Sequence, residues 1–521
     1  MKMSELYYWY EGNKIPLQLS MTKRAVKFDQ PSSSSENRRE IFNSMGAVSS
    51  DSNVVDLTNG IFLFNVVSQE NEGATVSLSS TPQGANPLMV FEAEDKTPMI
   101  LTEEFLAQFK SEITREKIDK FNEKNNVIIV AENEWEPNSF VLAVVNGKEE
   151  DSLKMANKYQ QNEIVVHAHP NFVRLLKPRF IPNDSLFLQQ WALRNTGQGG
   201  GIVGQDIDAS EAWDITKGSS NITISIIDEG VDYTHEDLNC SGKLVTGYDA
   251  VRRIDDPTPN RPDAHGTACA GIAAACGNNG RGVSGVAPEC KIMGVRIAFG
   301  TVINGEEAWV TNDFQTADGI TKAVNRGADV LSNSWGGGSP STTITSAIRR
   351  AKTVGRGGKG CVVCFAAGND NQAVSYPGTL SEVITVAACN EYGERKSPTS
   401  RDGETWWGSN FGPEVDVCAP GVHIVTTDIM GNGGYNPSGN YVTNFNGTSA
   451  ATPHVAGVAA LILSVNPSLT AQKVEDILRQ STDDLEQVGR DDFTGFGRIN
   501  ARKAVKMAQR ALPVPESTLL T

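Results

Sequence analysis

From residue 183 onward, short apolar runs alternate with stretches of helical periodicity. The apolar runs predict strands, and the small-residue or amphipathic stretches between them predict helices. This alternation is typical of an α/β domain with a mostly parallel sheet and helices on both faces. In that architecture, functional side chains gather at the carboxyl ends of the strands. The predicted strands cover 222–227, 292–296, 330–334 and 362–366, and the predicted helices cover 268–275, 314–326 and 343–352.

Residues 88–170 show a different order of elements. Apolar runs predict strands at 88–91, 127–130, 140–144 and 163–167, and a short helix at 153–159. A longer helix is expected after the first strand. The resulting β-α-β-β-α-β order is typical of a small ferredoxin-like α+β domain. The near-helical spacing that predicts the longer helix involves Phe105, Phe109, Ile113, Ile118 and Phe121.

The rest of the chain divides around these two domains. Residues 1–87 give few signals beyond a strand at 61–67, and we expect an N-terminal extension there. The basic, proline-bearing segment 171–182 is predicted to be a linker, because proline and the residue before it favour extended backbone. The α/β domain then covers 183–511, and a tail covers 512–521.

Composition narrows the class of protein. With 521 residues, 39% hydrophobic and 21% charged, the chain is predicted to be soluble and globular. A net charge of −16 argues against nucleic acid as a partner and allows acidic sites for cations. The chain contains no run of eighteen or more apolar residues, so no membrane span is predicted. The N-terminus lacks the apolar core of a secretory signal, so we expect a cytoplasmic location.

The eight cysteines all lie between Cys240 and Cys418. Without a secretory signal, all of them are expected to be reduced. Cys361 and Cys364 have the spacing of a metal or redox pair, but they lie in an apolar run. Because residues three apart on a strand face opposite sides, buried structural thiols are the favoured interpretation.

Four polar residues fall where the site of a parallel sheet is expected. Asp228 ends a predicted strand, His265 opens a predicted helix, and Asn369 follows another strand. Ser449 precedes an apolar helix whose first turn contains Pro453, so it would face the positive end of that helix. Each has an ordinary explanation as a turn or capping residue. Together, in the order Asp, His, Ser, they predict nucleophilic catalysis.

Residues 183 to about 510 resemble the subtilisin-like serine peptidases. The resemblance rests on four motifs, at 226–231, 265–271, 366–369 and 447–454. The domain at 88–170 resembles the propeptide of that family. The whole chain looks most like the calcium-dependent subtilisin-like proteases of cyanobacteria.

The resemblance implies a serine endopeptidase that works through an acyl-enzyme. Ser449 would be the nucleophile, His265 its base, and Asp228 the group that orients the imidazole. Asn369 and the Ser449 N–H would stabilise the oxyanion. His235 and His454 are much weaker candidates for the base.

Two positions depart from the family pattern. Ala450 follows the nucleophile where many relatives carry Met, and a small residue should be tolerated there. Glu229 follows Asp228 where relatives carry Ser, Thr or Asp, and we expect its side chain to point towards solvent.

The resemblance also implies a substrate-binding segment. Ser334, Trp335, Gly336 and Gly337 would pair with the substrate backbone, although a plain glycine turn is the alternative. Three acids lie near the expected S1 pocket in sequence and suggest a preference for basic P1 residues. These acids are Asp370, Asp402 and Glu404.

A calcium site is implied in the loop that begins at Cys276. Calcium takes six to eight oxygen ligands, and a looping backbone supplies several carbonyls at once. The alternative is an Asn-Gly turn without metal. By resemblance the ligands would be the side chains of Asp184, Asp237 and Asn279 and the carbonyls of Cys276, Arg281 and Val283.

The propeptide-like domain implies a self-processing zymogen that is cut within 171–182. Its partners would be its own propeptide and protein or peptide substrates. A permanent N-terminal domain is the alternative. A monomer is expected. Two other functions stay open: a peptide macrocyclase, which usually needs a larger lid than 299–313 provides, and an inactive peptide-binding module.

Overall fold

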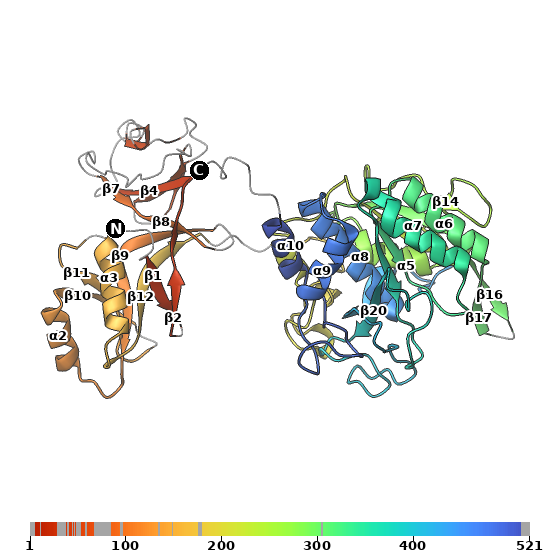
Figure 1. Ribbon diagram of the computed structural model, residues 1–521. Helices are drawn as coiled ribbons and strands as arrows, with labels where there is room; N and C mark the ends of the chain where they lie inside the picture. The colour runs from red at the N-terminus through yellow and green to blue at the C-terminus, as the bar shows by residue number, and fades with distance from the viewer. Residues whose placement is uncertain are drawn as a thin grey trace. The chain divides into compact units, whose positions relative to one another are not determined.

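The chain forms two compact units, Met1–Pro178 and Arg179–Thr521. They run from red to yellow and from yellow to blue in Figure 1. The predicted tail 512–521 and residues 176–179 of the predicted linker lie outside the described residues. The computed structural model describes residues 6–10, 12–28, 38, 41–43, 45, 47, 54–57, 60–66, 85–93, 97–133, 136–147, 149–175, 180–303 and 306–511.

The N-terminal unit contains the predicted β-α-β-β-α-β order. Its longest strand, β9, pairs antiparallel with β8, β11 and β12 in a six-stranded sheet. The predicted order is therefore confirmed, but its first strand is β9 rather than 88–91. The elements are β9 (Pro98–Phe109), α2 (Arg115–Lys124), β10 (Val127–Glu132), β11 (Ser139–Val144), α3 (Glu149–Gln160) and β12 (Val165–Arg174).

The predicted helix through Phe105 and Phe109 is wrong, because both residues lie on β9. Phe105, Ala107 and Phe109 are each at most 1% exposed, so alternate residues of this strand face the core. A spacing of four residues fits one helical turn as well as two strand repeats, which explains the error. The helix itself begins at Arg115, and Ile118 is its buried residue from the predicted set.

The other strands of this unit complete its sheets. The four-stranded sheet has the order β5-β6-β4-β7, and β6 confirms residues 61–65 of the strand predicted at 61–67, whose last residue lies outside the described residues. A separate hairpin joins β1 and β2, and β3 and β8 extend the six-stranded sheet. The bounds are β1 (Tyr7–Tyr10), β2 (Asn13–Pro16), β3 (Gln18–Leu19), β4 (Lys23–Phe28), β5 (Val54–Asp56), β6 (Ile61–Asn65), β7 (Ala85–Leu88) and β8 (Val90–Glu92).

The C-terminal unit is built on a seven-stranded sheet with the order β14-β15-β13-β18-β19-β20-β21. All neighbouring strands are parallel, as the alternation of strands and helices predicted. The strands are β13 (Thr223–Asp228), β14 (Tyr248–Asp249), β15 (Lys291–Arg296), β18 (Val330–Asn333), β19 (Val362–Ala366), β20 (Ile384–Cys389) and β21 (Val417–Pro420).

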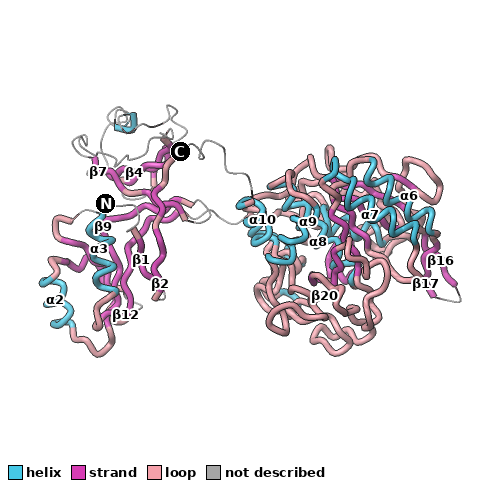
Figure 2. The backbone as a smooth tube through the Cα atoms, in the orientation of Figure 1, coloured by secondary structure: helices cyan, strands magenta, loops and turns pink. Residues whose placement is uncertain are grey.

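Helices cover both faces of this sheet (Figures 1 and 2). Residues of α5, α8, α9 and α10 pack on one face, and residues of α6 and α7 pack on the other. Two antiparallel hairpins, β16–β17 and β22–β23, stand outside the sheet. The remaining bounds are η3 (Phe187–Gln189), η4 (Gln198–Gly200), α4 (Ala209–Ala212), α5 (His265–Ala274), β16 (Phe299–Ile303), β17 (Glu306–Val310), α6 (Asp313–Asn325), α7 (Thr342–Gly358), β22 (Ile424–Thr427), β23 (Tyr441–Phe445), α8 (Thr448–Val465), α9 (Ala471–Gln480) and α10 (Ala501–Arg510).

The cysteines confirm one prediction and correct another. Cys361 and Cys364 are free and buried, and they pack into opposite faces of the sheet. The expectation that all eight are reduced is wrong, because Cys240 and Cys276 form a disulfide. These two are separated by 36 positions. Only the fold brings the turn that carries Cys240 against the loop that begins at Cys276.

The helix α8 is the one described helix that is long and apolar enough to cross a membrane. Within the protein, 89% of that stretch is buried, as in the core helix of a folded domain. It lies against the sheet and against α5 and α10. Its apolar composition is therefore explained by packing.

Candidate active site

Asp228 and His265 meet where β13 ends and α5 begins. The His265 Nδ1 atom lies 3.0 and 3.1 Å from the two carboxylate oxygens of Asp228. A carboxylate only accepts hydrogen bonds, so Nδ1 carries the proton and the other ring nitrogen, Nε2, is left as the acceptor of a neutral ring. Burial lowers the pKa of His265, but the charge of the fully buried Asp228 outweighs it and holds that pKa well above 6.5.

Ser449 lies in the first turn of α8, one residue after Thr448 begins the helix. Its hydroxyl donates to the Ser334 carbonyl at 3.1 Å, and the Ser334 hydroxyl donates back to the Ser449 carbonyl at 2.9 Å. Among the described residues, no hydrogen bond joins the Ser449 hydroxyl to His265. The two are linked through Cys269, whose Sγ lies 3.6 Å from the Ser449 carbonyl and 3.9 Å from His265 Nδ1. The Ser449 hydroxyl must therefore give up its hydrogen bond to Ser334 before it can donate to the imidazole.

The Asn369 side chain is oriented by Thr448. Its Oδ1 atom accepts hydrogen bonds from the Thr448 N–H at 2.8 Å and from the Thr448 hydroxyl at 2.9 Å. Both partners act as donors here, so the bonded atom must be the amide oxygen. The amide nitrogen of Asn369 is thereby left as a donor beside the start of α8. Asn369 is exposed, so that nitrogen is accessible to a bound molecule.

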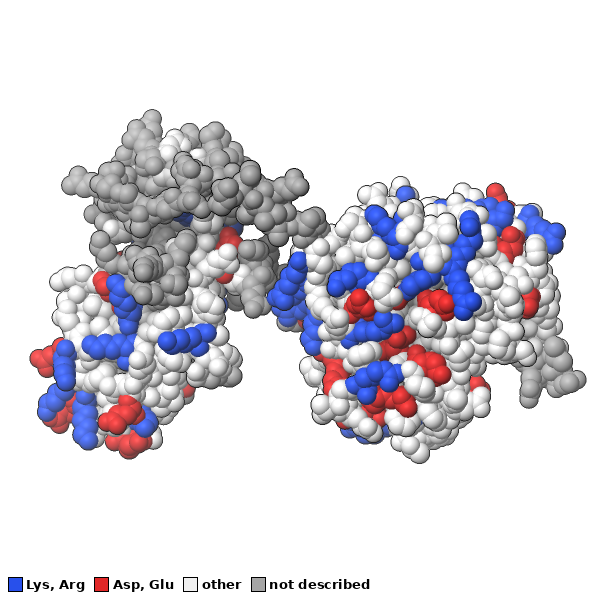
Figure 3. Space-filling view, viewed as in Figure 1, with Lys and Arg blue, Asp and Glu red and all other residues white. Residues whose placement is uncertain are grey.

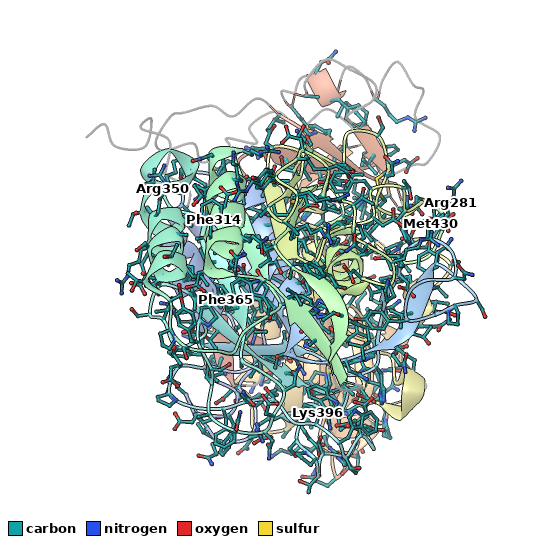
Figure 4. The ribbon with its side chains drawn as sticks, turned by 90° about the vertical axis from the view of Figure 1, so that its right-hand side faces the viewer. Arg281, Phe314, Arg350, Phe365, Lys396 and Met430 are labelled. Carbon is teal, nitrogen blue, oxygen red and sulfur yellow. A yellow bond between two sulfur atoms is a disulfide. The ribbon has the colours of Figure 1, made fainter. Side chains whose placement is uncertain are left out.

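A cleft opens beside His265. It is lined by His265, Trp309, Ser334, Trp335 and Gly336. Trp335 is fixed in this wall, because its indole N–H donates to the Ile227 carbonyl at 3.0 Å and its ring packs on Phe365, which Figure 4 labels. Gly337 does not line the cleft, and its N–H is used by the Tyr376 carbonyl at 2.8 Å. Of the predicted substrate-binding segment, residues 334–336 therefore face the cleft.

Glu229 does not point towards solvent, and that prediction is wrong. Its side chain is 4% exposed and accepts the main-chain N–H of His265 at 2.8 Å. The first N–H groups of a helix lack acceptors within the helix, so α5 draws this carboxylate inward. Burial, and then the charge of Asp228, raise the pKa of Glu229 to about 7.

Two of the three acids suggested for the S1 pocket are used inside the protein. Asp402 forms a fully buried ion pair with Lys396 at 3.0 Å, and Lys396 is labelled in Figure 4. Glu404 accepts the Trp407 indole N–H at 2.6 Å and the Asn446 amide at 2.7 Å. Asp370 alone of the three is exposed. The proximity of these acids in sequence therefore overstated the charge available to a ligand.

Two buried acids define the candidate calcium site. Asp184 accepts the N–H groups of Asn278 and Asn279, and Asp237 accepts the Val283 N–H and the Asn279 amide. Burial raises the pKa of Asp184, and burial with the charge of Asp184 raises that of Asp237 to about 7. Neither acid forms an ion pair with a lysine or arginine among the described residues.

The same loop offers carbonyl oxygens without donors. Within the described part of the chain, no hydrogen bond reaches the carbonyls of Cys276, Arg281 or Val283. Cys276 and Val283 are buried, at 3% and 0% exposed, so water replaces few of these bonds. Uncompensated carboxylates beside unpaired carbonyls are the ligands that calcium prefers, so the residues present fit this ion. The Arg281 side chain, labelled in Figure 4, is exposed.

The other candidate histidines are buried elsewhere. His235 is fully buried, with one ring nitrogen 2.8 Å from the Asn440 carbonyl, and burial lowers its pKa. His454 lies within α8 against the Ala450 carbonyl, and burial lowers its pKa to about 4. Neither lines the cleft.

Several residues around the cleft carried no signal in the sequence. Trp309 and Phe445 pack edge-on against the His265 ring, at centroid distances of 5.2 and 5.5 Å. They come from two hairpins, β16–β17 and β22–β23, whose positions depend on the whole fold. His423 was also missed, although its side chain contacts Glu391 and Glu404 beside the turn that precedes Ser449.

Charged side chains alternate in sign over the described face of the C-terminal unit that Figure 3 shows. That face has no continuous basic surface of the kind that binds a phosphate backbone.

The sequence matches known proteins over most of its length. The profile described as "Subtilase family" matches residues 219–497. A calcium-dependent protease of a Nostoc species is 36% identical over 465 residues, which cover 82% of this chain and 67% of the relative. Thermitase of Thermoactinomyces vulgaris is 38% identical over 328 residues, 63% of this chain and 100% of the relative. Among solved structures, a protease of Pseudoalteromonas arctica is 30% identical with a TM-score of 0.50, and covers 63% of this chain and 99% of that one.

Proposed function

Because the chain belongs to the subtilase family, we propose that it is a calcium-dependent serine endopeptidase, made as a zymogen, in which Asp228, His265 and Ser449 form the triad. One observation carries the assignment of residues. The bond from His265 Nδ1 to Asp228 leaves Nε2 as the free acceptor of the neutral ring, beside the helix start that holds Ser449. That is the arrangement a general base needs.

The chemistry follows from these groups. His265 takes the Ser449 proton as the hydroxyl attacks the scissile carbonyl, and the buried Asp228 stabilises the imidazolium that forms. The oxyanion then accepts hydrogen bonds from the Asn369 side-chain amide and from the Ser449 main-chain N–H. The latter is free because the second residue of α8 has no acceptor within its helix. His265 returns the proton to the leaving amine, and water later releases the acyl group.

The test compares the wild type with Ser449→Ala on a peptide substrate and with an irreversible serine-directed probe. We expect no turnover and no labelling in the variant, with an unchanged circular-dichroism spectrum. A folded variant with undiminished turnover would refute the assignment. N-terminal sequencing of both proteins tests the zymogen. The wild type should lose its N-terminal unit and the variant should keep it, whereas an intact active wild type would make that unit permanent.

Calcium would be held by Asp184, Asp237, Asn279 and the three unpaired carbonyls of the loop. The bound ion would neutralise two buried charges and stabilise the loop, without entering the reaction. We expect a chelator to lower the melting temperature of the wild type and to leave that of Asp237→Asn unchanged. Asp492→Asn removes an exposed carboxylate and should respond like the wild type. Equal melting temperatures with and without chelator in the wild type would exclude the site.

A preference for basic P1 residues is the most specific part of the proposal. It rests on Asp370, the exposed acid that follows Asn369. A peptide panel with Arg, Lys, Phe and Leu at P1 tests it, and Asp370→Asn should reduce cleavage after Arg by about fivefold if one exposed charge contributes about 1 kcal/mol. A preference of the wild type for large apolar residues over Arg would remove it.

A further inference from the structure

The turn that leads into Ser449 is braced by the segment that precedes β22. The Asn446 side chain accepts the His423 N–H through its oxygen at 2.8 Å and donates to Glu404 through its nitrogen at 2.7 Å. The next residue, Gly447, donates its N–H to the Gly421 carbonyl at 2.9 Å. A displacement of the His423 main chain is therefore passed directly to the residues before the nucleophile.

His423 itself is held in an unusual state. Its φ of 52° lies in the left-handed region, which few residues other than glycine adopt. Its two ring nitrogens face two different carboxylates. Nδ1 lies 3.0 Å from Glu391, and Nε2 lies 3.5 Å from Glu404.

The His423 ring is the positively charged partner of both carboxylates. Glu391 and Glu404 are 4% and 5% exposed, and His423 is the cation that pairs with them among the described residues. One oxygen of Glu391 is buried with no hydrogen-bond partner there. A third acid, Asp402, also faces His423 but is paired with Lys396. Burying two acids without a cation is costly, so the ring is under strong demand to be charged.

We infer that His423 is a positioning residue for Ser449. The doubly protonated His423 ring bridges Glu391 and Glu404, and this bridge holds Asn446 and the turn before the nucleophile. A neutral ring has one N–H, so one glutamate would then face a lone pair and be repelled. If Glu404 loses this ion pair, it shifts together with the Asn446 amide, whose hydrogen bond it accepts. The inference rests on the proposed function, because it concerns the geometry of that nucleophile.

The electrostatics of the cluster agree with this role. The hydrogen bond to Glu391 raises the pKa of His423 above 6.5; burial opposes this, and the charges of Glu391, Glu404 and Asp402 add to it. The His423 ring therefore keeps its second proton to a higher pH than an ordinary imidazole does. Deprotonation of His423 removes the bridge, whereas deprotonation of His265 creates the base. The two histidines thus act in opposite directions on turnover.

The experiment measures kcat and KM against pH for the wild type, His423→Asn and Glu391→Gln. Asparagine tolerates a positive φ, so the first variant removes the ring with little change of backbone. We expect kcat of the wild type to fall at alkaline pH. Both variants should lack this fall, and their kcat at neutral pH should be about 10- to 100-fold lower with little change in KM. Glu394→Gln, a neighbouring acid that bonds Arg401, should keep the wild-type profile.

A second measurement separates this inference from the proposed function. In the Ser449→Ala protein, the His423 ring and the Asn446 side-chain amide should titrate together by NMR with one pKa above 6.5. This readout needs no activity, so it stays informative if the chain is not a peptidase. Asn446 resonances that do not follow the His423 titration would overturn the inference, as would an unchanged alkaline fall of kcat in a folded His423→Asn or Glu391→Gln.

Discussion

Glu229 accepts the main-chain N–H of His265 at 2.8 Å, so a second buried carboxylate contacts the candidate base besides Asp228, which bonds its ring. The two consecutive acids thus bond different parts of the same residue. Asp228 bonds the ring, and Glu229 bonds the backbone at the start of α5. The second contact fixes where the helix begins, and with it the position of the ring.

We predict that Glu229→Gln stabilises the protein above pH 7. The unfolded carboxyl ionises near 4.5, whereas the folded one keeps its proton up to about 7. The folded state therefore loses stability as the pH rises through this window, and glutamine, which still accepts the His265 N–H, avoids that loss. Urea unfolding at pH 4.5 and pH 8 measures it.

The gain from Glu229→Gln should be small near pH 4.5, where the folded carboxyl is protonated and the unfolded one is half protonated. Glu289→Gln removes an exposed carboxylate and serves as the control, with equal stability to wild type at both pH values. A Glu229→Gln protein that is less stable than the wild type at pH 8 would contradict the prediction.

Removing the Asn369 amide nitrogen should lower kcat by about 10² to 10³ with little change in KM, because a donor to the oxyanion acts mainly in the transition state. Asn369→Asp is the sharper of two variants. Its carboxylate still accepts both Thr448 hydrogen bonds but offers no donor. Asn369→Ala removes both functions, and steady-state kinetics on one peptide compares the three proteins. If Asn369→Asp keeps wild-type kcat, the oxygen rather than the nitrogen is the useful atom.

His454 should make the protein sensitive to acid. Its pKa is near 6.5 in the unfolded chain and about 4 in the folded one, so the unfolded state binds a proton first. Stability is then complete above pH 6.5 and declines towards pH 4 by about 3 kcal/mol, from roughly 1.4 kcal/mol per pKa unit. In His454→Gln this part of the decline should be missing from urea unfolding curves. His167→Gln, in the other unit, should decline like the wild type.

The disulfide should contribute about 3–4 kcal/mol to stability, from the loop entropy of cysteines separated by 36 positions. We predict that the free energy of unfolding, measured with urea, is lower by that amount in the double variant Cys240→Ser, Cys276→Ser. A reducing agent should destabilise the wild type to a similar extent and leave the variant unaffected. Equal unfolding midpoints for oxidised and reduced wild type would show that the bond constrains little.

The sequence predicted the parallel sheet well because its signals are local. Buried strands such as Val362–Ala366 are continuous apolar runs. Asp228, His265 and Ser449 stand at the ends of the elements that carry them. Periodicity failed at Phe105 and Phe109, where a spacing of four suits two structures. The subtilase assignment came from motifs, which need no three-dimensional information.

The errors concern contacts that no local pattern encodes. Whether Glu229 turns inward depends on an unsatisfied N–H 36 positions later in the chain. The pairing of Cys240 with Cys276 and the contacts of His423 with Glu391 and Glu404 likewise join segments that only the finished fold brings together. Asp402 looked available to a ligand because its partner, Lys396, could not be identified from sequence.

Ser449 is carried on α8, whose residues Thr448–Leu463 are all buried. A segment enclosed in this way cannot expose its amides through small local openings, since the surrounding sheet and helices must separate first. Amide hydrogen exchange along α8 should therefore report the global unfolding free energy. Heat inactivation would then coincide with the cooperative loss of structure of this unit.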